Sequence, residues 1–237
     1  MKKAFTMIEL IFVIVVIGIL AATIIPNTKR NPVQEAAIQI ASHIRYTQHL
    51  AMTDDRYNPN RVDNSGAVIW FKERWQILFS SSKFTGGANV WAYTIFSDRA
   101  GTGVKRGDPN ESEIAKNPEN SNQLMTGGVG HVNAIKYGHK DFKGMESLNI
   151  GKKYGIIGAN AVVFSDSCDG NGGNPSTRIA FDYLGRPLQG DHNSMKGPYT
   201  QSRLIKAECR ITITDGSESV DIKIQPETGY VSLDYDP

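Results

Sequence analysis

Oxygen-rich side chains gather around one of the two cysteines, in the segment SDSCDGNGGN. Asp166, Asp169, Asn171 and Asn174 offer the carboxylate and amide oxygens that Ca²⁺ prefers, and the glycines between them would allow a flexible loop. Their spacing does not match the EF-hand loop, because the closing glutamate is missing. We therefore expect a plain turn beside Cys168 and no metal site, with a calcium loop as the alternative.

Catalytic motifs are absent from the sequence. It contains no G-x-S-x-G, H-E-x-x-H or P-loop, and the glycines between Thr126 and His131 do not join a convincing strand to a helix. The 26 Lys and Arg residues against 24 Asp and Glu residues give a net charge of +2, which favours neither nucleic acid nor an acidic partner for the whole chain. We expect a protein that is not an enzyme and has no cofactor.

A local basic segment could still hold DNA. Lysines alternate there with aromatic residues, a composition typical of surfaces that hold phosphates and stack on bases. Asp141 and Glu146 dilute the positive charge, so we expect a solvated loop, with DNA binding as the alternative. The residues concerned are Lys136, Lys140, Lys143, Lys152 and Lys153, with Tyr137, Phe142 and Tyr154.

Cys168 and Cys209 belong neither to a CxxC pair nor to a cluster with histidine, which argues against zinc. If the chain is exported, we expect them to form a structural disulfide, because oxidising compartments let two thiols stay paired. Two buried free thiols are the alternative. His43 and His49 are six residues apart on an expected helix and do not share a face, so we interpret them as surface or boundary residues.

Glu9 is the only ionisable side chain between Phe5 and Ile25. These 21 residues would span about 31 Å as a helix, close to the hydrocarbon thickness of a bilayer. A secretory signal peptide is the alternative, with Lys2 and Lys3 as its basic start and a cleavage site at 20–22. A carboxylate in an apolar segment is costly and usually has a partner, whereas a disposable signal peptide gains nothing from it.

The N-terminal residues KKA, FTMIELIFVIVVIGILAA and Pro26 resemble the N-terminus of type IV pilins and of the pseudopilins of type II secretion systems. Leader length, the Phe-Thr-x-x-Glu pattern and the proline all agree with that family. The segments RIAFDYLGRP and VDIKIQPETGYVSL are similar, with less specific motifs, to the C-terminal part of H-type (FimT-like) minor pseudopilins and of related minor pilins.

The resemblance implies that a prepilin peptidase cuts between Ala4 and Phe5 and that Phe5 is then N-methylated, although the family usually has glycine where this chain has Ala4. It also implies that Glu9 meets the Phe5 amine of another subunit during assembly, because an unpaired charge in an apolar core is expensive. The implied location is the inner membrane, with a single span, the N-terminus in the cytoplasm and the C-terminal domain in the periplasm. Membrane lipid would hold the subunit until an inner-membrane assembly platform moves it into a pilus or pseudopilus.

The rest of the chain predicts an α+β, pilin-like fold. Asn31 and Pro32 can start an amphipathic helix, whose apolar face runs from Val33 to Ala51 and which should end near Met52. Branched and aromatic segments separated by turns then predict an antiparallel sheet domain. The stretch 101–153 is polar and rich in glycine, so we expect a surface excursion with a short helix near 111–115. The predicted strands are 68–71, 75–81, 90–97, 161–165, 178–183, 204–213, 220–224 and 230–233.

These patterns divide the chain into a leader at 1–4, a transmembrane or filament-core helix at 5–25, an amphipathic helix at 26–53, and a β-rich domain at 54–237 with the insertion at 101–153. The leading hypothesis is a minor pseudopilin of a type II secretion system. The alternatives are a minor type IV pilin in pilus assembly or DNA uptake and, in a different class, a membrane-tethered periplasmic binding module. For the two filament hypotheses, the expected partners are prepilin peptidase and other pilin or pseudopilin subunits.

Overall fold

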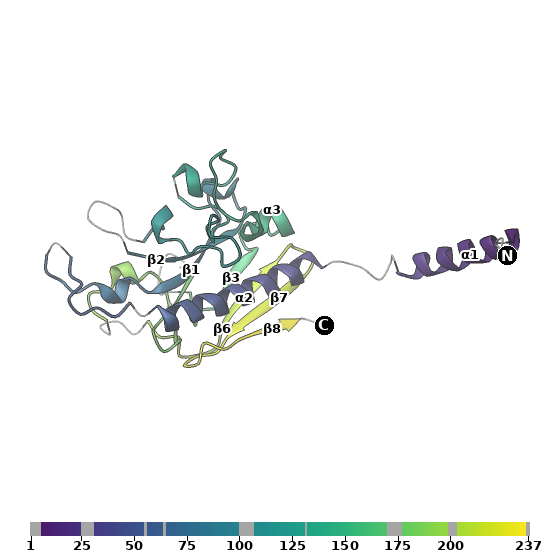
Figure 1. Ribbon diagram of the computed structural model, residues 1–237. Helices are drawn as coiled ribbons and strands as arrows, with labels where there is room; N and C mark the ends of the chain where they lie inside the picture. The colour runs from purple at the N-terminus through teal and green to yellow at the C-terminus, as the bar shows by residue number, and fades with distance from the viewer. Residues whose placement is uncertain are drawn as a thin grey trace. The chain divides into compact units, whose positions relative to one another are not determined.

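The computed structural model describes residues 6–24, 31–54, 56–63, 65–99, 107–130, 132–169, 177–198 and 203–235. The contacts within the chain divide it into two units, Met1–Asn31 and Pro32–Pro237. The first unit contains helix α1, Met7–Ile24, and the second contains a further long helix and the strands (Figure 1). The predicted α+β class, with N-terminal helices followed by antiparallel sheets, is confirmed at this coarse level.

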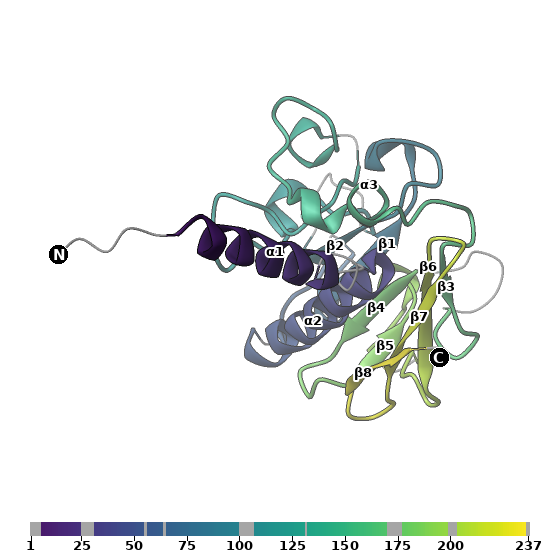
Figure 2. The ribbon, with the colours of Figure 1, turned by 90° about the vertical axis from the view of Figure 1, so that its right-hand side faces the viewer.

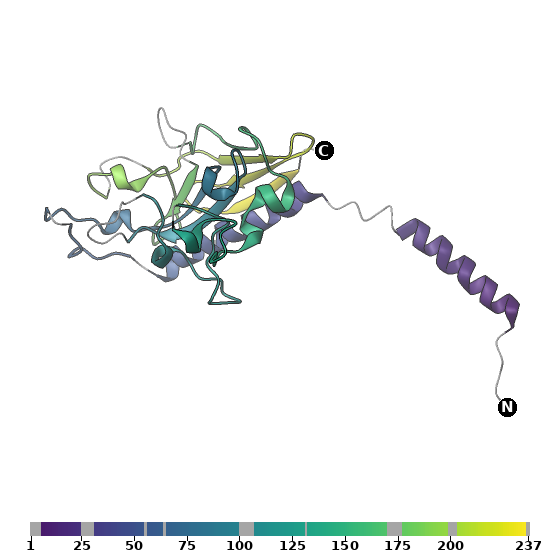
Figure 3. The same ribbon diagram turned by 90° about the horizontal axis from the view of Figure 1, so that it is seen from above.

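Helix α2, Pro32–Thr53, is the central element of the second unit. It begins at Pro32, as predicted, because the missing N–H and fixed φ of proline suit the first helical position. Its buried positions recur at steps of one, three and four residues and include Val33, Ile40 and Ile44. This face packs against strands of both sheets, and the short helix α3, Ile150–Tyr154, lies beside α2 (Figure 3).

The first sheet has the strand order β2-β1-β4-β5, and all its pairings are antiparallel. β1 and β2 pair with each other along their whole length. All six residues of β2 are buried, which means that both faces of this strand are covered. The strands are β1, Trp75–Ser80; β2, Ala92–Ser97; β4, Arg178–Phe181; and β5, Pro187–Gln189.

The second sheet has the strand order β3-β6-β7-β8 and is also antiparallel. Figure 2 shows β6, β7 and β8 side by side. Side chains along β6 and β7 alternate between buried and more exposed, so this sheet turns one face to the core and the other to solvent. The strands are β3, Val162–Phe164; β6, Cys209–Thr214; β7, Ser219–Ile224; and β8, Val231–Tyr235.

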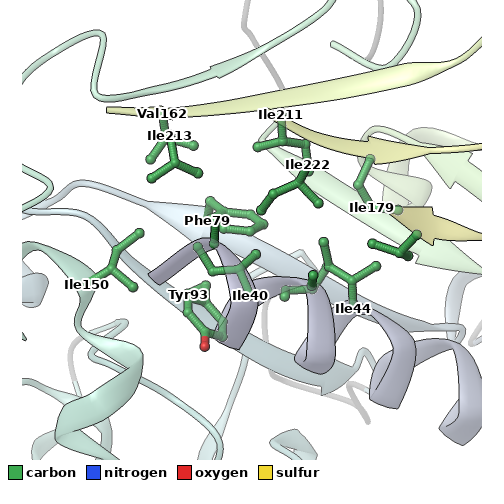
Figure 4. Close-up of a cluster of buried hydrophobic side chains, with 14 of the residues drawn as sticks. Ile40, Ile44, Phe79, Tyr93, Ile150, Val162, Ile179, Ile211, Ile213 and Ile222 are labelled. Atoms are coloured by element: carbon green, nitrogen blue, oxygen red, sulfur yellow. The ribbon is translucent and has the colours of Figure 1, made fainter. Parts of the chain in front are cut away.

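One cluster of buried apolar side chains joins α2 to both sheets (Figure 4). Ile40 and Ile44 come from α2, Phe79 and Tyr93 from the first sheet, and Ile222 from the second. Each of these five side chains is completely buried. Burial of this apolar surface is the main force that holds the helix against the sheets.

The prediction that 101–153 is a surface excursion was wrong for its described part. A second apolar cluster forms between this segment and β2, and its members are Phe96, Ile114, Leu124, Val129 and Ile135. The Ile95 N–H donates to the Met125 carbonyl at 3.0 Å, and the Ala115 N–H donates to the Ile95 carbonyl at 2.9 Å. The insertion therefore extends the sheet at the β2 edge and covers the face of β2 turned away from α2. Its expected short helix is a 3₁₀ turn, η4, Glu111–Glu113.

Two strand predictions also differ from the structure. The segment 68–71 leads into a 3₁₀ turn, η2, Trp70–Lys72, because both aromatic side chains pack into a small separate cluster with Met195. The segment 204–213 is not continuous, since β6 begins only at Cys209. β5 was not predicted; it has three residues and starts with proline. The described residues also contain the 3₁₀ turns η3, Lys83–Thr85; η5, Asn133–Ile135; η6, Glu146–Leu148; and η7, His192–Ser194.

Candidate functional site

Helix α1 exposes apolar side chains on every face. Between Met7 and Leu20, its large apolar residues are 47% to 80% exposed. An amphipathic helix would instead place its polar residues on one side. Contiguous apolar surface of this kind marks a site that another molecule covers. We therefore take α1 as the candidate functional site, with Glu9 as its only ionisable side chain.

Glu9 has a local role that the sequence interpretation missed. The backbone N–H and the hydroxyl of Thr6 both donate to Glu9 Oε2 at 3.0 Å, and the Glu9 N–H lies 3.4 Å from the Thr6 hydroxyl oxygen. This reciprocal arrangement is a capping box at the start of α1. The signal was present in the sequence as Thr-x-x-Glu ahead of an apolar segment. Hydrogen bonds from Thr6 lower the pKa of Glu9, and the bond from the Thr6 backbone has a larger effect than the bond from its side chain.

The predicted membrane placement needs correction. α1 has 18 residues and is therefore about 27 Å long, less than the roughly 30 Å hydrocarbon core of a bilayer. Over the described ranges, no helix combines the length and the apolar character that crossing a membrane requires. The expected single span in the inner membrane, with a cytoplasmic N-terminus and a periplasmic C-terminal domain, was wrong.

The expected processing site, Ala4 and Phe5, lies outside the described residues. Cleavage after Ala4 and methylation of Phe5 therefore stay predictions. The assembly role of Glu9 also stays a prediction, because the capping box explains the residue in the isolated chain without excluding a second role in a complex.

The predicted disulfide is confirmed. Cys168 and Cys209 are bonded, both are completely buried, and no free cysteine accompanies them. The bond joins the turn after β3 to the first residue of β6. The Ser165 hydroxyl accepts from the Arg210 N–H at 2.9 Å in the same place, so backbone and disulfide hold this corner together. Its position indicates a structural role.

Two of the four residues in the calcium hypothesis lie outside the described residues. Asn171 and Asn174 are not among the described residues. Asp166 is exposed and Asp169 is half-buried. Among the described residues, no three His, Cys, Asp or Glu side chains are grouped as metal ligands.

The basic segment is only partly available for DNA. Lys136, Lys140, Lys152 and Lys153 are exposed, and the rings of Tyr137 and Phe142 form an edge-to-face pair with centroids 5.6 Å apart. Lys143 and Tyr154, the two other residues, form contacts within the protein. The Lys143 Nζ lies 2.6 Å from Glu111 Oε1. Tyr154 is buried, and its hydroxyl donates to Gln39 Oε1.

A partly buried polar network between α2 and β2 was not predicted from the sequence. Gln39 Nε2 donates to the Tyr93 hydroxyl oxygen at 2.7 Å, and the same hydroxyl lies 2.7 Å from His43 Nδ1. Because the amide nitrogen can only donate, the Tyr93 proton is directed at His43. Burial lowers the pKa of His43 to about 4. The available signal was the spacing of four between Gln39 and His43, which places both side chains on one face of the helix.

Comparisons with family models, with curated proteins and with solved structures found no match for this chain.

Proposed function

We propose that this chain is a structural subunit of a pilin-like filament, in which α1 is buried among the corresponding helices of neighbouring subunits. The exposure of apolar side chains around the whole of α1 carries this proposal. A helix that is apolar on all faces is stable in water only when other apolar surface covers it. Similar helices from other subunits provide such a surface and can repeat along a filament.

The fold of the second unit supports the same function. The amphipathic helix α2 follows α1 in the sequence and packs on antiparallel sheets, which is the order that the pilin resemblance implies. Among pilin-like subunits, we favour a minor pseudopilin of a type II secretion system, because the H-type resemblance extends into β4 and the β7–β8 hairpin. A minor type IV pilin is the second candidate, and the exposed lysines beside the Tyr137–Phe142 pair favour it.

Glu9 acquires its partner on assembly in this proposal. Within the described part of the chain, Glu9 is exposed and its carboxylate accepts hydrogen bonds from Thr6. Inside a bundle of apolar helices the surroundings have a low dielectric constant, where an uncompensated carboxylate is costly. After cleavage behind Ala4, the Phe5 amine of a neighbouring subunit supplies the compensating positive charge and sets the order of addition.

Substitutions at Glu9 and Thr6 separate docking from capping. Glu9→Gln removes the charge but keeps a side chain that can complete a capping box. Thr6→Ala weakens the cap by roughly 0.5 to 2 kcal/mol and keeps the carboxylate. We expect Glu9→Gln to impair incorporation into filaments and Thr6→Ala to leave it largely intact, as measured by co-sedimentation of the subunit with filaments sheared from the native cells.

The reverse pattern would refute the docking role. If Glu9→Gln were incorporated normally and Thr6→Ala were not, the capping box alone would explain the importance of Glu9.

The filament proposal itself is tested by a cysteine introduced at Ile14, which is 60% exposed. Disulfide cross-linking through this position should join the chain to another pilin-like subunit. Cross-links only to unrelated proteins, or none, would contradict the proposal.

A further inference from the structure

Exposed lysines gather where the insertion and α3 meet the turn η3. Among the described residues, none of these lysines forms an ion pair. Other lysines of the second unit do form such pairs, as Lys143 does with Glu111 and Lys223 with Asp234. The five residues, which we call the lysine face, are Lys83, Lys136, Lys140, Lys152 and Lys153.

Contacts around Gly86 bring these lysines to one surface. The Tyr137 N–H donates to the Phe84 carbonyl at 3.1 Å, which joins the insertion to η3. A Cβ at Gly86 would lie 2.8 Å from Tyr137 Cδ1 and 3.3 Å from Lys152 Cε, so both side chains contact this glycine. Only glycine suits the position, because its φ of +94° is also unfavourable for residues with a side chain. Segments far apart in the sequence therefore carry the lysines of one face.

The backbone beneath the lysine face is held by one side chain. Asn149 is completely buried, and its Nδ2 donates to the Thr85 carbonyl at 2.8 Å and to the Gly127 carbonyl at 2.9 Å. Its Oδ1 accepts from the Lys152 N–H at 3.0 Å, at the start of α3. Asn149 thus ties η3, the insertion and α3 together. The backbone positions of the lysines are therefore set before any partner arrives, which reduces the entropy lost on binding.

Acidic residues compensate the lysine face only in part. Asp141 lies in the same segment, with its carboxylate 3.5 Å from His139 Nδ1, and Glu146 is exposed nearby in the sequence. Five ammonium groups therefore outnumber these two carboxylates. An excess of one sign of charge attracts a surface of the opposite sign and orients it on approach.

The aromatic rings among the lysines are half-buried and already in contact with the protein. The Tyr137 and Phe142 rings meet each other edge-to-face, and a Cβ at Gly144 would lie 2.3 Å from Phe142 Cζ. Lys83 Nζ lies over the Phe84 ring, 5.3 Å from its centroid. Single-stranded nucleic acid needs open ring faces for its bases, and helices that lie on lipid insert open aromatic or leucine side chains. These rings favour a partner that offers negative charge alone.

We propose that the lysine face binds an acidic segment of a partner protein, whose carboxylates pair with several of the lysines at once. A single exposed ion pair contributes little, so binding requires the lysines to act together. The surface lies entirely in the second unit and does not depend on α1 or on the filament proposal. It gives the chain a specific partner in addition to its contacts through α1.

The test uses the full-length chain and fluorescein-labelled decaglutamate, with fluorescence anisotropy as the readout. We expect a saturable rise in anisotropy that weakens as salt is added. Labelled decaglutamine, which has the same length and no charge, should not bind. Equal binding of the two peptides would overturn the proposal, because the lysines would then contribute nothing.

Matched variants locate the binding. Replacing both Lys136 and Lys152 by glutamine should weaken decaglutamate binding roughly threefold to tenfold. The same change at Lys196 and Lys206, two exposed lysines outside the lysine face, should leave it unchanged. All four positions are exposed, so each variant should fold. Equal losses in the two double variants would contradict the assignment to this face.

Other polyanions complete the test. The Lys136 and Lys152 double variant should lose more affinity for decaglutamate than for oligothymidylate of equal charge or for phosphatidylglycerol vesicles. A larger loss with oligothymidylate would assign the face to nucleic acid, and a larger loss with the vesicles would assign it to lipid. Either result would overturn the proposal.

Discussion

Protonation of His43 should destabilise the second unit in mild acid. In the folded chain, burial lowers the pKa of this imidazole from 6.5 to about 4. The neutral ring accepts the proton of the Tyr93 hydroxyl, which itself accepts from Gln39. A protonated ring would present an N–H to that hydroxyl, so the three groups could no longer bond in this way.

The sign of the effect follows from the two pKa values. Between pH 6.5 and about 4 the unfolded chain binds a proton at His43 and the folded chain does not. The contribution of neutral His43 to the free energy of unfolding is therefore fully present above pH 6.5 and is lost as the pH falls toward 4. The difference between the two pKa values corresponds to about 3 kcal/mol in the free energy of unfolding.

Guanidinium unfolding at a series of pH values measures this contribution. His43→Gln keeps a side chain that can accept from Tyr93 and cannot be protonated. Between pH 7.5 and 4, the free energy of unfolding of the parent chain should therefore fall by about 3 kcal/mol more than that of His43→Gln. His192, whose pKa is also lowered by burial, is present in both proteins and cancels in the difference. His49→Gln, an exposed position on the same helix, is the control. Parallel pH profiles for the parent chain and His43→Gln would refute the reasoning.

Three further predictions concern the rest of the second unit. Replacing Cys168 and Cys209 by alanine should lower the free energy of unfolding by about 4 kcal/mol, because the bond closes a loop with a sequence separation of 41; an unchanged unfolding midpoint would contradict this role. Gly127→Ala should destabilise the chain more than Gly138→Ala, since a Cβ at 127 would lie 2.2 Å from the Leu148 backbone, whereas one at 138 meets nothing within 4 Å and adds only the backbone strain of a φ of +78°; equal losses in thermal unfolding of the two variants would contradict tight packing inside the insertion. Alanine at Lys136, Lys140, Lys152 and Lys153 together should leave DNA retention in a filter assay unchanged, and a salt-dependent loss would favour the DNA-binding minor pilin.

Regular patterns made much of the second unit predictable. The apolar face of α2 follows the helical repeat, and the start of the helix at Pro32 follows from the geometry of proline. Strands β1, β2 and β7 have enough branched and aromatic residues to be recognised. The pairing of Cys168 with Cys209 was also accessible, because no other cysteine competes.

The insertion was not predictable from local patterns. Its apolar residues Ile114, Leu124 and Ile135 each have one apolar neighbour at most and are separated by polar, glycine-containing segments, so no helical or strand repeat marks them. They are buried because β2 offers Phe96 on the face turned away from α2, which is a tertiary effect.

At α1, sequence reasoning identified the residue and missed its local chemistry. Thr6 and Glu9 form an ordinary capping box, a local role that does not depend on the cost of a carboxylate in an apolar segment. The apolar pattern also did not show at which residue the helix begins. α1 starts at Met7 and ends at Ile24.

The mass of the mature chain tests the central claim most directly. If the chain is a pilin-like subunit, intact-protein and N-terminal peptide mass spectrometry of material from the native cells should show that residues 1–4 are missing and that Phe5 is first and carries a methyl group. A chain that keeps Met1, or one that starts near Thr23 as a cleaved signal peptide would leave it, would contradict the account.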